Sequence, residues 1–365
     1  MGFQQGALES LVELRDRSVV VTGHTGFKGG WLSLWLADLG AQVHGYALAP
    51  PTEPNLFEVG QVAQALATDT RADLADLAAL TATLERSRPE VVFHLAAQPL
   101  VSEGYRDPLR TVASNVTGTA NLLEAIRSAD SVRAVVVVAT DKVYENPETG
   151  RAFSERDPLG GHDPYSASKA AAEIVVASYR SSFFGSGRHS ARIASARAGN
   201  VIGGGDWAAD RLVPDCLRAF AAGEPVRLRS PDAVRPWQHV LSPLSGYLAL
   251  AARLLGEGGD HFARAWNFGP DVGDDARVGD VAQTVATLWG SGAQVLRGSD
   301  RQLHEAGLLR LDSGQARSEL GWAPRWSLQQ ALEQTVAWHQ AWRRGDAMQT
   351  VCLEQIRAYL GMAVR

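Results

Sequence analysis

Two residues of the sequence, Tyr165 and Lys169, have the types and the spacing that can generate a reactive phenolate. Asp163 and Pro164 precede them and are typical of a helix start. Residues four apart lie on one face of a helix, so the ammonium would lie beside the phenol. A free tyrosine titrates near pH 10, so a phenolate at neutral pH needs a shift of about three pKa units, or roughly 4 kcal/mol. The pair is expected to take a proton from a hydroxyl group.

A second polar group, Thr140, Asp141 and Lys142, follows an apolar run at 133–140. Ligands of parallel α/β sheets bind at the carboxyl ends of such strands. Thr140 could share a hydrogen bond with the hydroxyl that Tyr165 deprotonates. Asp141 could donate a proton to a leaving hydroxyl, and Lys142, with a lowered pKa, could accept a carbon-bound proton. The alternative interpretation of Asp141 and Lys142 is a solvated ion pair in a loop.

A glycine-rich turn, TGHTGFKG, follows the first apolar run and precedes a helical pattern. Its three glycines would let the turn close, let the backbone approach a pyrophosphate and let the helix pack on the strand. The N-terminus of the helix then faces the anion. This GxxGxxG spacing predicts dinucleotide binding by Gly23, Thr25, Gly26, Phe27, Lys28 and Gly29. An ordinary tight turn is the alternative.

The expected dinucleotide is NAD. The second strand ends in the sequence YAL at 46–48, which offers no arginine for a 2′-phosphate, although it also lacks the acid that often binds the ribose hydroxyls. Asp69, at the end of the third strand, is expected either to accept from the adenine amino group or to cap a helix. A positively charged nicotinamide ring would join Lys169 in lowering the pKa of Tyr165.

Short β-branched runs alternate with helical patterns in the first half of the chain. Strands are predicted at 18–23, 41–48, 65–70, 90–97 and 133–140, mostly as continuous apolar runs, which are typical of strands covered on both faces. This alternation predicts an α/β fold of the Rossmann type, with a doubly wound parallel sheet.

The composition of the sequence changes after about residue 200, where Gly, Pro, Trp and Arg cluster. We therefore expect a NAD-binding domain over 1–198, rejoined by about 236–267. A smaller, irregular substrate lobe would take up most of 199–365, with a closing helix at about 327–343.

Composition excludes several classes of protein. The 365 residues are 21% charged and 45% hydrophobic, with a net charge of −5 and no basic run, so disorder, nucleic-acid binding and binding to anionic membranes are not expected. No apolar stretch reaches the roughly 20 residues of a membrane span, and the N-terminus has no signal-peptide pattern. Two cysteines, Cys216 and Cys352, are too few for a disulfide framework or a zinc site, and no metal is expected. We expect a cytoplasmic protein.

Taken together, the motifs resemble those of the extended short-chain dehydrogenase/reductase superfamily and, within it, of the CDP-glucose 4,6-dehydratase family. The resemblance extends over about 19–342 and is carried by segments that include GHTGFKGGWLSLWL, FHLAAQPLV, TDKVYEN, GGHDPYSASKAAAE, RAGNVIGGGDWAADRLVPD and RPWQHV. The Asp-Lys pair is typical of the CDP-glucose branch, whereas the thymidine-diphosphate branch usually has Asp-Glu. One departure is Ser102, where the family commonly has arginine.

The resemblance implies an NAD-dependent dehydration of CDP-glucose to CDP-4-keto-6-deoxyglucose. Tyr165, assisted by Lys169 and Thr140, would remove the proton of the C4 hydroxyl while hydride passes from C4 to NAD. Lys142, or a water that it holds, would remove the C5 proton as Asp141 protonates the departing C6 hydroxyl. Hydride would then return to C6, so NAD would be regenerated.

The resemblance also implies the remaining contacts. Ala96 and Ala97 would line the cofactor, and Asn115 would lie near the active site or pack helix on strand. Guanidinium groups match phosphate geometry, so arginines are the best candidates for a diphosphate clamp. The expected substrate residues are Gln98, Asn200, Arg211, Arg235 and His304, with Arg197 and Trp237 as further candidates and a core position as the alternative for Trp237. A homodimer or homotetramer is implied, through the helix after Lys169 and the one near 115–126.

Other functions remain open at this point. A nucleotide-sugar 4-epimerase would share Thr140, Tyr165 and Lys169 but has no need of an acid/base pair that eliminates water, so Asp141 and Lys142 favour a dehydratase. A reductase would consume NAD(P)H stoichiometrically. A non-catalytic dinucleotide-binding protein is compatible with the same fold, although it has no use for a phenolate.

Overall fold

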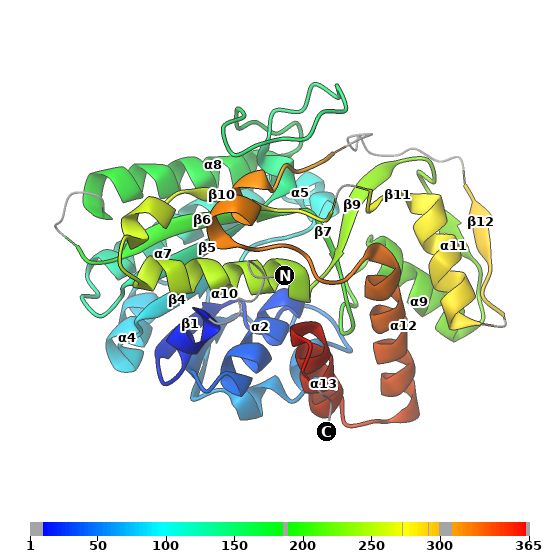
Figure 1. The fold of residues 1–365 in the computed structure, drawn as a ribbon, viewed down its shortest axis with the longest axis horizontal. Helices are drawn as coiled ribbons and strands as arrows, with labels where there is room; N and C mark the ends of the chain where they lie inside the picture. Colours follow the sequence, from blue (N-terminus) through cyan, green and yellow to red (C-terminus); the bar gives the residue numbers. More distant parts are fainter. Residues whose placement is uncertain (1–9, 185–188, 272, 291, 299–308, 363–365) are drawn as a thin grey trace.

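The computed structural model describes residues 10–184, 189–271, 273–290, 292–298 and 309–362. Its centre is a seven-stranded parallel sheet in the order β10-β6-β5-β4-β1-β2-β3 (Figure 1). The strands are β1 (Ser18–Thr22), β2 (Gln42–Ala47), β3 (Thr68–Arg71), β4 (Val91–His94), β5 (Ala134–Thr140), β6 (Arg192–Ala198) and β10 (Ala265–Phe268). The strand order reverses between β1 and β4, and ligands bind at the carboxyl ends of strands beside such a reversal. The predicted Rossmann-type α/β fold is confirmed.

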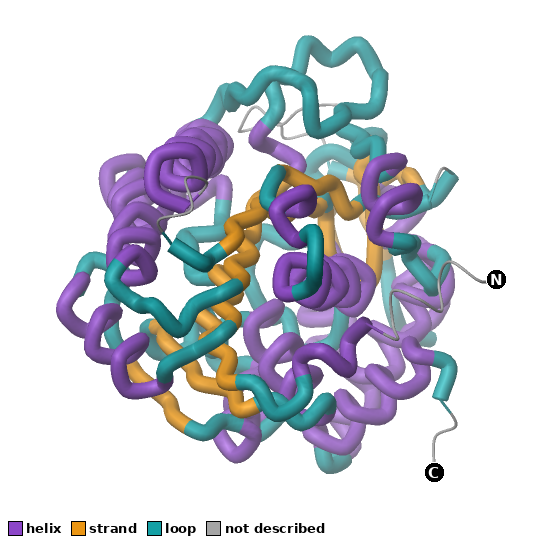
Figure 2. The backbone as a smooth tube through the Cα atoms, turned by 60° about the vertical axis from the view of Figure 1, so that its left-hand side comes forward, coloured by secondary structure: helices purple, strands orange, loops and turns teal. Residues whose placement is uncertain are grey.

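Helices cover both faces of the sheet, so the strands run between two helical layers (Figure 2). One layer holds α4 (Leu77–Ser87), α7 (Gly118–Arg127) and α8 (Pro164–Tyr179), and the other holds α2 (Phe27–Asp38), α10 (Leu241–Leu255) and α13 (Met348–Leu360). Successive residues of a strand face opposite layers: Val135 and Val137 of β5 pack in the first core, Val136 and Val138 in the second. Both faces are apolar, which explains the continuous apolar runs of the sequence.

The second half of the chain adds a lobe with an apolar core of its own, on the right in Figure 1. It contains α9 (Leu212–Ala222), α11 (Val278–Trp289), α12 (Leu328–Arg344) and the paired strands β8 (Val226–Leu228) and β12 (Val295–Arg297). A three-stranded sheet is formed by β7 (Asn200–Ile202), β9 (Val234–His239) and β11 (Asp275–Arg277). Between β9 and β11 the chain returns to the large sheet to form α10 and β10.

Short helical segments complete the described part of the chain. They are η1 (Ser10–Leu14), α3 (Leu56–Val59), η2 (Val62–Ala65), α5 (Val101–Arg106), α6 (Pro108–Val112), η3 (Ala113–Thr117), η4 (Asp141–Val143), η5 (Arg180–Phe184), η6 (Gly259–Phe262) and η7 (Ala316–Leu320). Within the described ranges, no helix combines the length and the apolar character that crossing a membrane requires.

Candidate active site

The first turns of α8 present Tyr165 and Lys169. Asp163 caps this helix by accepting a hydrogen bond from the Ser166 amide at 2.9 Å, and Pro164 occupies its first turn. The predicted helix start is thereby confirmed. The side chains of Tyr165 and Lys169 are both buried.

The carboxyl end of β5 meets this face of α8. Lys169 Nζ donates to the Val138 carbonyl at 2.9 Å, and the Tyr165 hydroxyl is hydrogen-bonded to that of Thr140. Thr140 Oγ1 also donates to Asp141 Oδ1 at 3.0 Å. The structure therefore brings four of the predicted catalytic residues together at one edge of the sheet.

Lys142 follows directly, in η4. Its amide donates to Thr140 Oγ1 at 3.4 Å, and its side chain is half-buried. The charge of Lys142 acts on Asp141 by lowering the pKa of that carboxyl group, against a larger effect of burial. An acid and an amine thus lie side by side at the strand end.

Burial dominates the acid–base behaviour of the site. It raises the pKa of Tyr165 to about 12 and lowers the pKa of Lys169 to about 8. It also raises the pKa of Asp141 above the ordinary value for an aspartate. The protein's own groups therefore hold Tyr165 as a phenol at neutral pH, and the expected phenolate requires an additional positive charge beside the ring. Asp141 is suited to keep a proton and to donate it.

Two arginines of the second half reach this site. Arg211, at the start of α9, binds Asp206 at 2.7 Å and lies close enough for its charge to lower the pKa of Tyr165. Arg235, in β9, is buried, and its charge lowers the pKa of Asp141. Arg211 therefore lies near Tyr165, and Arg235 lies near Asp141.

The structure gives the other predicted substrate residues no hydrogen bond with Tyr165 or Asp141 in the part of the chain that it describes. Asn200 is half-buried in β7 and pairs in register with Trp237 of β9. Gln98 Nε2 donates to Thr111 Oγ1 at 2.9 Å, so this side chain holds the segment after β4. His304 lies outside the described residues. Contacts of these residues with a substrate remain predictions.

Two further candidates belong to the interior. Arg197 pairs with Glu173 at 2.6 Å and donates to the Tyr144 hydroxyl at 2.7 Å, with arginine and glutamate both buried. A buried charge is tolerated where its hydrogen bonds are satisfied, and here the protein itself satisfies them. Trp237 is also buried, in the core of the lobe, and its Nε1 donates to the Ala276 carbonyl at 3.1 Å. We therefore correct Arg197 from a candidate substrate contact to a structural residue, and the core position that was the alternative for Trp237 is confirmed.

Asn115 connects the segment after β4 to the catalytic helix. Its Oδ1 accepts from the Gln98 amide at 2.8 Å, and its Nδ2 donates to Ser168 Oγ on α8 at 2.8 Å. Ala97 lies in the segment that these bonds fix, and it is half-buried. Asn115 therefore positions the segment after β4 against α8.

The glycine turn is shaped for close approach of another group to the backbone. Gly23 has φ +77°, and a Cβ atom there would lie 2.7 Å from the Ala96 nitrogen; a Cβ atom at Gly29 would lie 2.0 Å from the Gly23 carbonyl oxygen. The Gly26 amide closes the turn by donating to that carbonyl at 3.0 Å, and α2 begins at Phe27. The residues present thus fit a dinucleotide pyrophosphate at the start of α2.

The side chains of Thr25 and Lys28, both in the glycine turn, interact with other parts of the chain. Thr25 Oγ1 donates to the Leu48 carbonyl at 3.0 Å. Burial lowers the pKa of Lys28 to about 8, and the charges of Arg211 and Asp141 also act on its ammonium group. Lys28 is half-buried and lies close enough to Asp141 for the charge of that carboxylate to act on its ammonium group.

The sequence analysis missed the contacts that Asp69 makes with His24 of the glycine turn and with Arg71. The Asp69 carboxylate binds His24 Nε2 at 2.8 Å and Arg71 Nε at 2.8 Å. Helix α4 is capped by Asp76, so the helix-cap interpretation of Asp69 is wrong. In the described residues, no group of three or more His, Cys, Asp and Glu side chains could hold a metal ion.

Comparison with known proteins decides the family. Residues 19–262 match the model of the NAD dependent epimerase/dehydratase family. This chain belongs to that family.

Individual proteins resemble the chain over most of its length. It is 46% identical to the CDP-glucose 4,6-dehydratase of Salmonella typhimurium, over 96% of this chain and 98% of that relative. Among solved structures, MoeE5 in complex with UDP-glucuronic acid and NAD is 27% identical, with a TM-score of 0.73 over 90% of this chain and 99% of that one. DesIV, a dTDP-glucose 4,6-dehydratase from Streptomyces venezuelae, is 24% identical, with a TM-score of 0.75 over 90% and 98% of the two chains, and shows a likeness of fold.

Proposed function

We propose that the protein is a CDP-glucose 4,6-dehydratase that converts CDP-D-glucose to CDP-4-keto-6-deoxy-D-glucose with NAD. The observation that carries the proposal is the buried Asp141, whose raised pKa suits a proton donor and whose carboxylate is linked through Thr140 to Tyr165. Support also comes from the relative of the same activity, which is 46% identical over nearly the whole chain.

The cofactor and the substrate are assigned to different parts of the chain. Bound NAD supplies the acceptor and the donor of hydride. We assign it to a domain formed by 1–198 and about 236–267, with the contacts Gly23, Thr25, Gly26, Phe27, Lys28, Gly29, Asp69, Ala96, Ala97, Tyr165 and Lys169. We assign the nucleotide sugar to the lobe within 199–365, where Arg211 and Arg235 clamp the diphosphate.

Oxidation at C4 requires a base for the C4 hydroxyl proton. Tyr165 takes this role because its hydroxyl is hydrogen-bonded to Thr140 and because Lys169 lies one helical turn away on the same face. Thr140 shares the proton being moved, since its own hydroxyl donates to Asp141. Tyr165 ends this step as a phenol, the form that burial favours.

The resulting C4 ketone acidifies the C5 hydrogen, which prepares the loss of water. Lys142, or a water held by it, takes the C5 proton. Asp141 gives its proton to the departing C6 hydroxyl, so one water leaves and a C5–C6 double bond forms. Reduction at C6 and return of a proton to C5 complete the product. A 4-epimerase has no elimination step, and an acid of raised pKa at Asp141 therefore favours the dehydratase.

The substrate class is tested by incubating the purified chain and NAD with CDP-glucose, dTDP-glucose and UDP-glucose in parallel. We expect CDP-glucose to give the fastest loss of one water, measured by mass spectrometry of the nucleotide sugars. Faster conversion of either other nucleotide sugar would overturn the base assignment. An isomer of unchanged mass would overturn the dehydratase assignment in favour of the epimerase.

We also propose that the protein forms a homodimer or a homotetramer. Exposed apolar side chains lie on neighbouring helices, with Leu109 82% and Val112 45% exposed on α6 and Ile174 59% exposed on α8. Such a face is commonly covered by a second copy.

A cytoplasmic location is proposed because Cys216 and Cys352 are both free thiols, as expected in a reducing compartment.

Ile174→Asp is expected to convert the oligomer to a monomer. The new carboxylate would have to be desolvated in the interface, whereas in the monomer it lies in water. Light scattering after size exclusion measures the mass, and Ile174→Val is the matched control. An unchanged mass of Ile174→Asp would exclude α8 from the interface.

A further inference from the structure

The end of β3 places an arginine beside the end of β2. Ala47 of β2 pairs with Arg71 of β3, so Arg71 lies at the carboxyl edge of the sheet next to Leu48. In doubly wound sheets the adenosine ribose of a dinucleotide lies near the end of the second strand, and an arginine nearby accommodates the 2′-phosphate of NADP. The sequence at 46–48 offers no such arginine, but the neighbouring strand supplies one.

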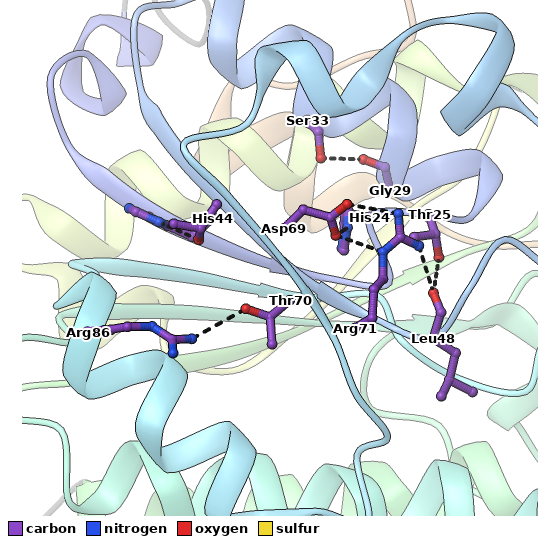
Figure 3. A network of polar contacts seen from close by, with 11 residues as sticks. His24, Thr25, Gly29, Ser33, His44, Leu48, Asp69, Thr70, Arg71 and Arg86 are labelled. Atoms are coloured by element: carbon purple, nitrogen blue, oxygen red, sulfur yellow. Dashed lines mark hydrogen bonds and ion pairs between the residues drawn. The ribbon is translucent and has the colours of Figure 1, made fainter.

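The guanidinium group of Arg71 is held in one position (Figure 3). Its Nε and Nη2 atoms bind the two oxygens of Asp69 at 2.8 and 2.9 Å, and its Nη1 donates to the Leu48 carbonyl at 3.2 Å. The guanidinium carbon lies 4.4 Å from the centroid of the Phe57 ring. The side chain remains 34% exposed, so a ligand at this edge can reach it.

Asp69 is fixed from its other side by His24. The His24 ring is buried, meets Phe57 edge-on at 5.6 Å and binds Asp69 Oδ1 at 2.8 Å. A Cβ atom on Gly45 would lie 2.6 Å from this ring, so the histidine fills the space above that glycine. Burial lowers the pKa of His24, which makes it a neutral donor at pH 7. The charge of Asp69 is therefore balanced by Arg71 alone.

We propose that the Asp69–Arg71 pair selects NAD by excluding a 2′-phosphorylated dinucleotide. Asp69 occupies two donors of the guanidinium group and cancels its charge, so Arg71 has no net positive charge to offer a 2′-phosphate. The ribose hydroxyls of NAD carry no charge and need no cation at this position. This inference rests on the dinucleotide site of the proposed function but is independent of the sugar chemistry.

Asp69→Asn tests the pair directly. The amide oxygen still accepts a hydrogen bond, whereas the negative charge is lost and Arg71 becomes available to a phosphate. We expect the ratio of the NADP and NAD dissociation constants to fall by about tenfold or more, the size of one hydrogen bond to a charged group. Calorimetric titration of the purified full chain with NAD and with NADP measures both constants.

Two further variants keep the result interpretable. Adding Arg71→Gln to Asp69→Asn should abolish the gain in NADP affinity. Arg86→Gln is the matched control, because Arg86 is an exposed arginine bound to Thr70, which faces the other way along the same strand (Figure 3). An unchanged ratio in Asp69→Asn, or a gain that persists without Arg71, would overturn the inference. A chain that binds NAD without dehydrating CDP-glucose would contradict the proposed function, while the ratio would still decide this inference.

Discussion

Tyr165→Phe is expected to lower kcat for CDP-glucose dehydration by about 10²–10⁴-fold, the usual contribution of a general acid or base. The substitution removes one hydroxyl and leaves the buried ring in place. NAD affinity should change little, because Tyr165→Phe removes one hydroxyl from the cofactor contacts and leaves the glycine turn and Lys169 untouched. Turnover is measured by mass spectrometry of the nucleotide sugars, and NAD binding by calorimetric titration.

Tyr179→Phe provides the matched control, since Tyr179 ends the same helix and its side chain is paired with Glu124. This variant should retain wild-type turnover. Wild-type turnover in Tyr165→Phe would remove the residue from the chemistry, and loss of NAD binding together with turnover would assign it to the cofactor site alone.

The second large effect is expected for Asp141→Asn. The amide can still accept the hydrogen bond from Thr140, but it has no acidic proton to give to the departing C6 hydroxyl. Loss of water should slow by about 10²–10⁴-fold. Oxidation at C4 does not use this proton, so reduced NAD should accumulate and be visible by its absorbance.

The rate of water loss is also expected to depend on pH through Asp141. The pKa of Asp141 is raised, so the wild-type carboxyl keeps its proton to a higher pH than an ordinary aspartate. The rate of water loss should fall as pH rises through that pKa, because the acid form disappears, and this limb should be absent from the residual activity of Asp141→Asn.

Asp157→Asn is the control for this pH effect. Arg151 lowers the pKa of Asp157 to about 2, so its carboxylate is ionised throughout the working range. The pH profile of this variant should match that of the wild type. Dehydration by Asp141→Asn at the wild-type rate would require another proton donor.

The parts of the site that could be predicted from sequence are those built from local segments. Gly23, Gly26 and Gly29 lie in one turn, and Asp163 and Pro164 mark the start of the helix that carries Tyr165. Each group is close in sequence, so helix and turn geometry alone determine how its members lie. Thr140 could be added to these groups because it ends a predicted strand, and the carboxyl ends of parallel strands lie together at one edge of the sheet.

The parts that were missed depend on contacts between distant segments. Arg197 looked available for phosphate binding, yet Glu173 from α8 neutralises it inside the protein. Arg71 follows Asp69 by two residues in β3, so alternation along the strand places both on one face, and this signal could have revealed the pair. Nothing in the sequence, however, indicates that His24 reaches Asp69 across β2.

The central claim is an internal transfer of hydride from C4 to C6 with loss of water. It is tested most directly with CDP-glucose that carries deuterium at C4, incubated with the purified chain and catalytic NAD. The account predicts a product lighter by one water, with the deuterium at C6 and no net reduced NAD. A product of unchanged mass, or a dehydrated product whose deuterium has been lost to solvent, would contradict it.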